Sequence, residues 1–393
     1  MPPLEGILVA DFSRVLAGPL AAMLLGDLGA DVVKVERPDG GDDTRAWGPP
    51  WRDGVATYYL GLNRNKRSIA LDLKDEADRA LARTLGERAD VMIESFRPGL
   101  LASWGLDGDT LRAANPGLVS CSVTAFGSGA AGAGLPGYDF LAQAMGGLMA
   151  VTGEEGGRPL KVGAAVIDLV TGLIAANGIQ AALVERARTG RGRHVEATLM
   201  DSALAALLNQ GTAWVAAGVR PGRMGNRHPS IVPYQDFATA DRPLAIAAAN
   251  DRLFQRLCTA IGRAELASDE RFANNEARVA NAAALIAELE ATLRTEPAEH
   301  WLARLREAKV PAGPINEIDE AFALAAELGL HPVEEIDGIP LVTPPLQVDG
   351  ERLPIRRRPP RLDEHGDELR AWLADRGSDP FGPASAPPGR LDA

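Results

Sequence analysis

The chain has 393 residues, of which 46% are hydrophobic and 24% are charged, and 41 Lys and Arg against 53 Asp and Glu give a net charge of −12. This composition predicts a globular protein long enough for two domains, and its acidic balance argues against nonspecific nucleic-acid binding. The two cysteines, Cys121 and Cys258, lie in apolar runs, which favours buried thiols in a reducing compartment and therefore a cytoplasmic location.

Short apolar runs alternate with helical patterns over the first 220 residues. The runs predict buried strands at 6–12, 31–36, 68–73, 90–94, 118–123 and 194–199. Helical spacing predicts helices at 19–28, 76–88, 138–150, 169–187 and 201–217. Strands that alternate with helices predict an α/β fold with a doubly wound, mostly parallel, Rossmann-like sheet.

The pattern changes after Gly218, where the segment 220–230 is rich in Arg, Gly, Asn and Pro and is typical of a linker. A strand at 244–249 and helices at 252–262, 280–293 and 297–308 follow. We therefore predict a large α/β domain over 1–220, a small α+β domain over 221–325 and a segment 326–393 that returns to the large domain. Within that segment we expect a helix near 364–374 and poor order over 380–393, which is rich in Pro, Gly and Ser.

Neither a metal site nor a membrane segment is indicated. The five histidines are scattered and no CxxC motif is present. The first residues lack the basic and apolar regions of a signal peptide. The longest apolar run, 164–184, is interrupted by Asp168, Asn177 and Gln180, which argues against a membrane span.

Asp168 is a single carboxylate in the apolar, glycine-bounded run 163–172. The helical spacing that follows it places Asp168 in or beside the first turn of a helix, where unpaired N–H groups and the helix dipole would keep it ionised. Asp is a preferred N-cap residue, so position alone favours a cap, and an ionised carboxylate could also be a nucleophile. Both interpretations therefore stay open.

Cations and aromatic side chains recur where the predicted strands end. Arg37 ends one strand, and Ser95, Phe96 and Arg97 end another. Three further cations lie in the segment 63–68, just ahead of a third strand. Because parallel sheets bind ligands at the carboxyl ends of their strands, these residues suit an anionic, adenine-bearing cofactor. The alternative for 63–68 is a solvated turn.

Three further motifs have simpler interpretations. Gly127–Gly132 fits G-x-G-x-x-G, but more glycine and Pro136 follow where a nucleotide site would open a helix, so we interpret it as a loop and not as an NAD site. Asp139 begins a predicted helix and could be its cap. His228 lies in an unusual loop-to-strand segment, where it could contact a substrate or simply be exposed.

Together these motifs resemble class III CoA-transferases. The resemblance is carried by Asp11-Phe, Ala17-Gly-Pro, 29–37, 65–69, Pro98-Gly, Gly137-Tyr-Asp, 189–192, Pro233-Tyr and 313–316, in the order and spacing of the family. It extends from Leu4 to about Asn316. The family includes formyl-CoA transferase, carnitine CoA-transferases and the racemase of 2-methylacyl-CoA thioesters.

The resemblance implies an enzyme that moves coenzyme A between carboxylic acids. Asp168 matches the nucleophile, which attacks the acyl-CoA thioester to form a mixed anhydride and then an aspartyl-CoA thioester, and Asp139 matches an acidic position beside it. The CoA contacts are expected at Val15, Arg37, Leu71, Ser95, Phe96 and Tyr138, to which we add Arg97 from its place at a strand end.

Two departures from the family bear on the substrate. Leu16 replaces a glutamine that handles the small acyl group in formyl-CoA transferase, which disfavours formyl and oxalyl groups. The segment 247–251, matching that enzyme's mobile glycine loop, has no glycine; within it Asn250, together with His228, is a candidate substrate contact. The residues around His228 resemble the branch that moves CoA from succinyl-CoA to dicarboxylic acids, so the nearby Arg223 and Arg227 could meet a distal carboxylate.

Two rival functions share this fold. The racemase has histidine where this chain has Tyr138, and tyrosine cannot easily replace it as an acid–base group. A noncatalytic acyl-CoA-binding protein is disfavoured by the presence of Asp168. The resemblance also implies a homodimer of interlocked rings, with linkers near 200–230 and 325–340, acting on acyl-CoA and a carboxylic acid without a metal.

Overall fold

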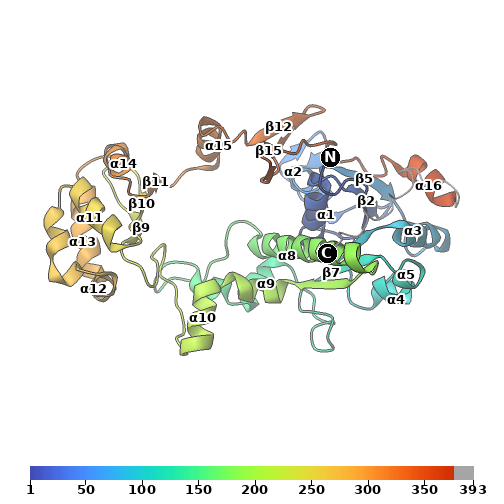
Figure 1. The fold of residues 1–393 in the computed structure, drawn as a ribbon, viewed down its shortest axis with the longest axis horizontal. Helices are drawn as coiled ribbons and strands as arrows, with labels where there is room; N and C mark the ends of the chain where they lie inside the picture. Colours follow the sequence, from blue (N-terminus) through green and yellow to red (C-terminus); the bar gives the residue numbers. More distant parts are fainter. Residues whose placement is uncertain (376–393) are drawn as a thin grey trace. The chain divides into compact units, whose positions relative to one another are not determined.

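The computed structural model describes residues 1–375, which form two compact units (Figure 1). The first unit comprises Met1–Leu148, Lys161–Val219 and the described residues from His331 onward, and the second comprises Met149–Leu160 and Arg220–Leu330. The short segment Met149–Leu160, expected in the large domain, belongs to the second unit. The tail 380–393, for which we expected poor order, lies outside the described residues.

A parallel sheet of six strands forms the centre of the first unit, as the alternating pattern predicts. Its order is β5-β2-β1-β6-β7-β8, so the direction of winding reverses between β1 and β6. Doubly wound sheets bind ligands at this switch point, outside the carboxyl ends of the strands. The strands are β1 (Leu8–Asp11), β2 (Asp31–Glu36), β5 (Lys66–Ala70), β6 (Val91–Glu94), β7 (Val119–Thr124) and β8 (His194–Thr198).

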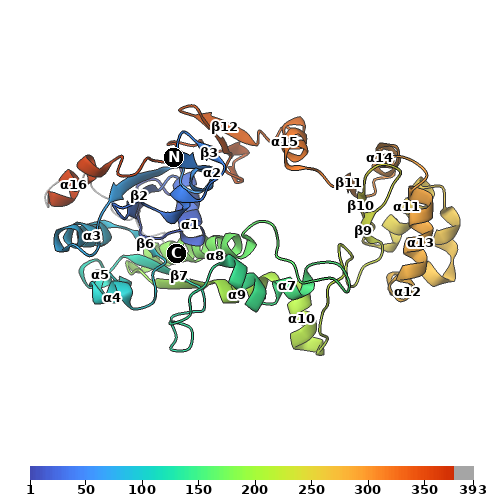
Figure 2. The ribbon, with the colours of Figure 1, turned by 180° about the vertical axis from the view of Figure 1, so that it is seen from behind.

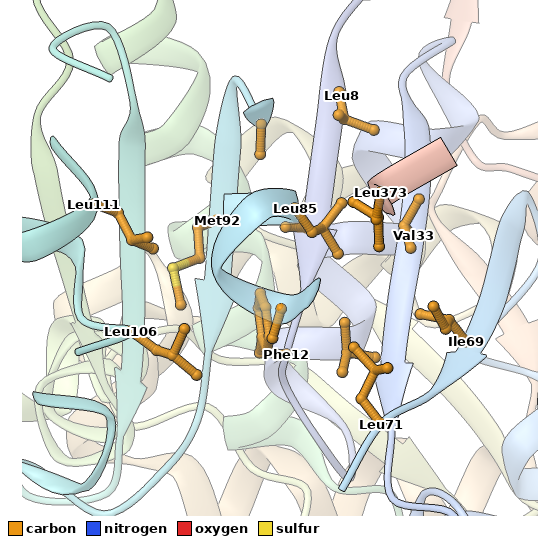
Figure 3. Packing of buried hydrophobic residues seen from close by; sticks show 14 of the residues in the cluster. Leu8, Phe12, Val33, Ile69, Leu71, Leu85, Met92, Leu106, Leu111 and Leu373 are labelled. Carbon is orange, nitrogen blue, oxygen red and sulfur yellow. The ribbon is translucent and has the colours of Figure 1, made fainter. Parts of the chain in front are cut away.

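Both faces of this sheet are buried, which explains why its strands are continuous apolar runs. On one face, α1 (Ala17–Asp27) and α8 (Val166–Thr189) pack together over β1, β2 and β6. On the other face, side chains of α3 (Glu76–Arg88), α5 (Gly108–Ala114) and α16 (Gly366–Ala374) cover the sheet, and Figure 3 shows Leu85 and Leu373 against Leu8 and Val33. The helix α8 is long and apolar enough to span a membrane by length and composition, but 44% of its most apolar window is buried inside the protein.

Two predicted helices are each broken in the structure. The helix expected at 138–150 divides into α6 (Asp139–Met145) and α7 (Leu148–Val151), because Gly147 between them has a φ of +87°. The helix expected at 201–217 divides into α9 (Leu199–Ala206) and α10 (Leu208–Ala217). The remaining elements of the first unit are short: β3 (Trp51–Arg52), β4 (Val55–Ala56), α2 (Thr57–Leu60), α4 (Leu100–Ser103), β12 (Val333–Ile336), β13 (Ile339–Val342), β14 (Gln347–Val348), β15 (Glu351–Arg352) and the 3₁₀ helix Asp43–Ala46.

The second unit is the smaller α+β part that the sequence predicts. Its antiparallel sheet has the order β11-β10-β9 and packs on helices around Phe237, Leu257 and Trp301. Its elements are β9 (Tyr234–Phe237), β10 (Leu244–Ala247), α11 (Asp251–Ala260), α12 (Asn275–Ala280), α13 (Ala282–Leu293), α14 (Ala298–Glu307), β11 (Ala312–Pro314), α15 (Ile318–Glu327) and the 3₁₀ helices Ala264–Ser268 and Glu270–Phe272.

The segment from Arg356 to α16 lies along the edge strand β5 of the large sheet, and Figure 1 labels both β5 and α16. The N–H of Asn65 donates to the carbonyl of Arg357 (2.9 Å), and the N–H of His365 donates to the carbonyl of Ser68 (3.0 Å). These bonds occupy backbone groups that an edge strand would otherwise expose.

Candidate active site

Asp168 lies in the first turn of α8 and is only 8% exposed, but it does not cap the helix. The N–H groups of Ile167 and Asp168 instead donate to Oδ1 of Asp139, at 2.8 and 3.2 Å. Asp139 therefore caps α8 from the start of α6, a neighbour that is distant in sequence. This excludes the cap interpretation of Asp168 and shows that Asp139 caps a helix other than its own.

The carboxylate of Asp168 has few polar contacts. In the described part of the chain no donor forms a hydrogen bond with it, and its side chain lines an open pocket. Burial, and then the negative charge of Asp139, raise the pKa of Asp168 to about 7. The helix N–H groups expected to hold Asp168 ionised are instead occupied by Asp139, which adds a second negative charge, so Asp168 exchanges its proton near neutral pH.

Asp139 is held from two sides. Its Oδ1 accepts the two N–H groups of α8, and its Oδ2 accepts a hydrogen bond from Nε2 of Gln143 at 2.6 Å. Because both oxygens are occupied, this residue fixes the start of α8 relative to α6. It thereby determines where the Asp168 carboxylate lies.

The pocket around Asp168, called here the aspartate pocket, includes four large side chains that we did not predict. Phe140 adjoins the predicted Asp139, and the other three are Trp47, Tyr58 and Lys161. The rings of Trp47 and Tyr58 meet edge to face with centroids 5.4 Å apart. Burial, with the nearby charges of Asp168 and Asp139, raises the pKa of Tyr58 to about 12, so its hydroxyl stays protonated and can donate a hydrogen bond. Nζ of Lys161 donates to the carbonyls of Val162 and Gly163, at 3.1 and 3.0 Å.

The sequence contains little that could have indicated these three residues. Trp47 follows a 3₁₀ turn, Tyr58 lies in a four-residue helix and Lys161 lies in a segment without regular secondary structure, so none belongs to a periodic pattern. Besides Asp139 and Asp168, two residues that the sequence did predict, Val15 and Tyr138, line the aspartate pocket. The full lining is Val15, Trp47, Tyr58, Tyr138, Asp139, Phe140, Lys161, Gly163, Ala165 and Asp168.

A second pocket lies at the switch point of the sheet, and we call it the switch-point pocket. It is lined by residues that follow β1, β2, β5 and β6, among them the predicted Arg37, Leu71 and Phe96. The loops after β1 and β6 are joined here, because the N–H of Arg14 donates to Oγ of Ser95 at 2.9 Å. Its further cations are Arg14, Lys74 and the buried Lys34. The Arg14 guanidinium lies 5.7 Å from the centroid of the Phe96 ring.

Arg97 and the glycine-rich loop lie together in a different place. Arg97 lines a pocket with 124–127 and 132–138, beyond the carboxyl end of β7. No helix opens at Gly127–Gly132, which confirms that the motif is a loop, and it projects from the first unit in both views (Figures 1 and 2). A Cβ at Gly132 would lie 1.9 Å from the Phe126 carbonyl oxygen, so glycine is required for the turn.

The cations of 63–68 form neither a phosphate site nor a solvated turn, and both interpretations are wrong. Their side chains are buried and ion-paired. The pairs join Arg64 to Asp27 (2.6 Å), Lys66 to Asp11 (2.9 Å) and Arg67 to Asp31 (2.6 Å). A basic run at a strand start cannot be told from a buried ion-pair network by sequence, because the partners are distant in the chain.

The remaining substrate candidates have local structural partners. Leu16 is 9% exposed and packs with Leu20 and Met23. In the second unit, Nδ1 of His228 accepts a hydrogen bond from the N–H of Ser230 (3.0 Å), and Asn250 caps α11 through the N–H of Leu253 (2.9 Å). Their roles toward a substrate stay predictions.

The arginines suggested for a distal carboxylate also lie in the second unit. Nη2 of Arg227 contacts Oε2 of Glu155, so this cation already has an anionic partner. The Arg223 guanidinium donates to the Ala150 carbonyl at 3.4 Å.

Known proteins share this sequence and this fold. The model of "CoA-transferase family III" matches residues 4–366. The chain belongs to CoA-transferase family III. It is 44% identical over 388 residues to the succinate–glutarate CoA-transferase of Agrobacterium fabrum, covering 95% of this chain and 96% of the relative. It is 38% identical to a succinyl-CoA:mesaconate CoA-transferase of Haloarcula hispanica, covering 94% of this chain and 96% of the relative.

A solved structure agrees with this membership. The CAIB/BAIF family protein from Brucella suis superimposes with a TM-score of 0.84 at 45% identity, covering 94% of this chain and 99% of that one. The family assignment and the parallel α/β architecture predicted from the sequence are thereby confirmed. The protein is a CoA-transferase, an enzyme class whose substrates are CoA thioesters.

Proposed function

We propose that this CoA-transferase moves CoA from a donor such as succinyl-CoA to a short dicarboxylic acid, with Asp168 as the nucleophile. The observation that carries the proposal is a buried carboxylate that makes no hydrogen bond with the described residues and lines an open pocket. The loop after β1 joins this pocket to the switch point, since Ser13 and Arg14 line one pocket and Val15 lines the other. One extended CoA thioester could therefore occupy both.

In the proposed reaction, the ionised Asp168 attacks the thioester carbon of the donor, the carbon–sulfur bond breaks and CoA leaves as a thiolate. The thiolate then attacks the aspartyl carbonyl of the mixed anhydride and releases the donor acid. The acceptor carboxylate attacks the resulting aspartyl-CoA thioester, which gives a second anhydride and frees the thiolate again. Attack of the thiolate on the acceptor carbonyl forms the product and restores Asp168.

The two pockets suggest how CoA is held. We place the nucleotide end in the switch-point pocket, where Leu71 and Phe96 offer apolar surface and Lys74 offers a cation for a phosphate. Arg14 and Arg37 pair with Asp43, at 3.4 and 2.7 Å, so a phosphate would have to replace that carboxylate as their partner. Tyr138 and Val15 then lie on the side of the thioester. Ser95 holds the loop after β1, and Arg97 lies toward the glycine-rich loop.

The experiment is the substitution Asp168→Asn, assayed with succinyl-CoA and glutarate. Asn has nearly the same shape and cannot form the anhydride, so turnover should vanish while the fold is kept. Hydroxylamine added to wild-type enzyme with succinyl-CoA should modify Asp168, as mass spectrometry of peptides would show. Normal turnover by a variant proven free of deamidation would contradict the nucleophile assignment.

The dicarboxylate part of the proposal is supported by the names of two relatives and by Lys161. Among the described residues that line the aspartate pocket, Lys161 is the single cation. It uses two hydrogen bonds on backbone carbonyls and has a third N–H to offer a carboxylate at the far end of the substrate. This role replaces the one suggested by the sequence for Arg223 and Arg227.

The substitution Lys161→Met tests this role, because Met keeps much of the length and loses the charge. We expect kcat/KM for glutarate to fall about tenfold to a hundredfold, the worth of a charge-assisted hydrogen bond, while kcat/KM for butyrate changes little. An equal effect on both acids would show that Lys161 does not read the second carboxylate.

We propose further that the protein acts as a homodimer of interlocked chains. Large apolar side chains of α8 and α10 are exposed on the single chain, including Leu173, Ile174, Leu208 and Val215. Exposed apolar surface of this kind is characteristic of a protein–protein interface. A second copy of the chain is the partner that the family resemblance implies.

A further inference from the structure

The loop that joins the two pockets contains a strained residue. Val15 has a φ of +73°, in the left-handed region where a β-branched side chain clashes with its own backbone. Such a residue persists only when its surroundings hold it there, and strain of this kind is concentrated at functional sites. Groups that contact the backbone of Val15 must therefore hold it in this conformation.

Three side chains hold three consecutive N–H groups of this loop. Asp11 accepts the N–H of Ser13 (3.0 Å), Ser95 accepts that of Arg14 (2.9 Å), and both carboxylate oxygens of Asp42 lie near the N–H of Val15 (3.3 and 3.4 Å). The Asp42 bond is the one made at the strained residue itself. It is also the longest of the three and is therefore the most easily lost.

Asp42 is in turn fixed by a buried cation. It is 2% exposed, and its Oδ2 lies 2.9 Å from Nζ of Lys34, which is fully buried. The same Nζ donates to the carbonyl of Ser13 at 3.0 Å, so one ammonium group holds both the loop and the carboxylate. The N–H and hydroxyl of Thr44 donate to Oδ1 of Asp42 at 2.9 and 2.7 Å.

The carboxylate stays charged in this setting. The pKa of Asp42 is lowered to about 2, because Lys34 and the hydrogen bonds from Thr44 outweigh the cost of burial. A charged acceptor binds an N–H group more strongly than a neutral one does. Asp42 therefore has the charge and the rigid support needed to hold a strained backbone.

We infer that Asp42 is a positioning residue that holds Val15 in its left-handed conformation and thereby places the acyl-CoA thioester against Asp168. Resting on the proposed function, this inference assigns a role to a buried carboxylate that makes no contact with the reacting atoms. Asp42 lines the inner wall of the switch-point pocket, and Val15 lines the aspartate pocket. A shift of the loop would change the distance between the bound CoA and the nucleophile.

The test compares Asp42→Asn with Asp27→Asn. Asp27 is a matched control, because it is also buried and also paired with a cation, Arg64. It is the last residue of α1, whereas the loop that contains Val15 precedes the first residue of that helix. For Asp42→Asn we expect kcat with succinyl-CoA and glutarate to fall about tenfold to a hundredfold, as small misplacements do, while the Kd of free CoA stays within about threefold. Asp27→Asn should leave both values close to those of the wild type.

Two readouts separate positioning from a general loss of stability. The N–H of Val15 should exchange with heavy water at least tenfold faster in Asp42→Asn than in Asp27→Asn, measured without substrate. Glycine adopts a positive φ at little cost, so the same Asp42 substitution should cost less than about threefold in kcat when made in a Val15→Gly background. If Asp42→Asn does not fold, the double variant Lys34→Met/Asp42→Asn is used in its place, because it removes both charges of the buried pair and leaves neither unpaired.

The inference is overturned by any of three results: unchanged exchange at Val15, a kcat equal to that of Asp27→Asn, or an undiminished loss in the Val15→Gly background. Absence of transfer by the wild-type enzyme would count against the proposed function alone. The exchange experiment would still decide whether Asp42 holds Val15.

Discussion

At the scale of single residues, the reactivity of Asp168 depends on its protonation. Its pKa is raised to about 7 by burial and by Asp139, and only the ionised form is a nucleophile. We therefore predict that kcat/KM for succinyl-CoA falls about tenfold per pH unit below pH 7, since this parameter reports the free enzyme. The measurement is a pH–rate profile from 5 to 9.

The variant Asp139→Asn provides the control for this profile. It removes the negative charge that helps to raise the pKa of Asp168, yet its amide oxygen can still accept the N–H groups of α8. The acid limb of the profile should therefore move to lower pH. A limb at the same position in both enzymes would assign it to another group.

The same pKa predicts how stability depends on pH. Folding raises the pKa of Asp168 from 3.8 to about 7, so the folded protein binds this proton more tightly than the unfolded chain does. The free energy of unfolding should therefore decrease as pH rises from about 4 to about 7, by up to ~4 kcal/mol from this group. Asp168→Asn cannot ionise and avoids the loss, so its advantage over wild type in urea denaturation should be larger at pH 8 than at pH 5. An advantage independent of pH would show that Asp168 is ionised without cost.

At the scale of elements, the contact between α1 and α8 sets the distance from the loop after β1 to the nucleophile. A Cβ at Gly172, one turn after Asp168, would lie 2.8 Å from the Ala17 carbonyl oxygen and 2.9 Å from Cδ2 of Leu20. The backbones of the two helices therefore meet at Gly172. Because the Ala17 carbonyl belongs to the backbone, a methyl group at position 172 cannot be accommodated by the movement of a side chain.

We predict that Gly172→Ala separates the two helices and reduces both Tm and kcat/KM. Overpacking of this kind costs about 1–3 kcal/mol, which exceeds the gain in helix propensity of about 1 kcal/mol. Gly178→Ala is the control, because its Cβ would meet the end of the Val195 side chain, at 2.8 Å, and not a backbone. Calorimetry and steady-state kinetics of both variants decide the matter, and equal behaviour would argue against the close helix contact.

The sequence predicted the elements of the sheet well and the pocket poorly. The six strands of the large sheet follow from apolar runs, because burial on both faces leaves a simple pattern. Trp47, Tyr58 and Lys161 lie outside any periodic segment, so their convergence on Asp168 depends on tertiary structure. The capping of α8 by Asp139 was missed for the same reason, since its partners are 28 and 29 residues away.

At the scale of the whole molecule, the exposed apolar side chains of α10 predict an oligomer. Leu208 and Val215 are 74% and 84% exposed on the single chain, which favours their burial by a second copy. We predict a sedimentation mass of about twice the 41.4 kDa chain. The substitutions Leu208→Asp and Val215→Asp should shift the protein toward monomer, and a monomeric wild type at micromolar concentration would refute the proposed dimer.

The pairing of β5 with the segment around 356–370 also has a consequence for synthesis on the ribosome. Arg370 donates to the carbonyl of Ala70 across a separation of 300 residues. At about 5–20 residues per second, an edge of the nascent sheet stays open for roughly 15–60 s before its cover is made. Open edges recruit other strands, so a nascent chain of this enzyme should bind a holdase chaperone until residue 370 has left the ribosome, and stalling synthesis before and after that point would reveal the release.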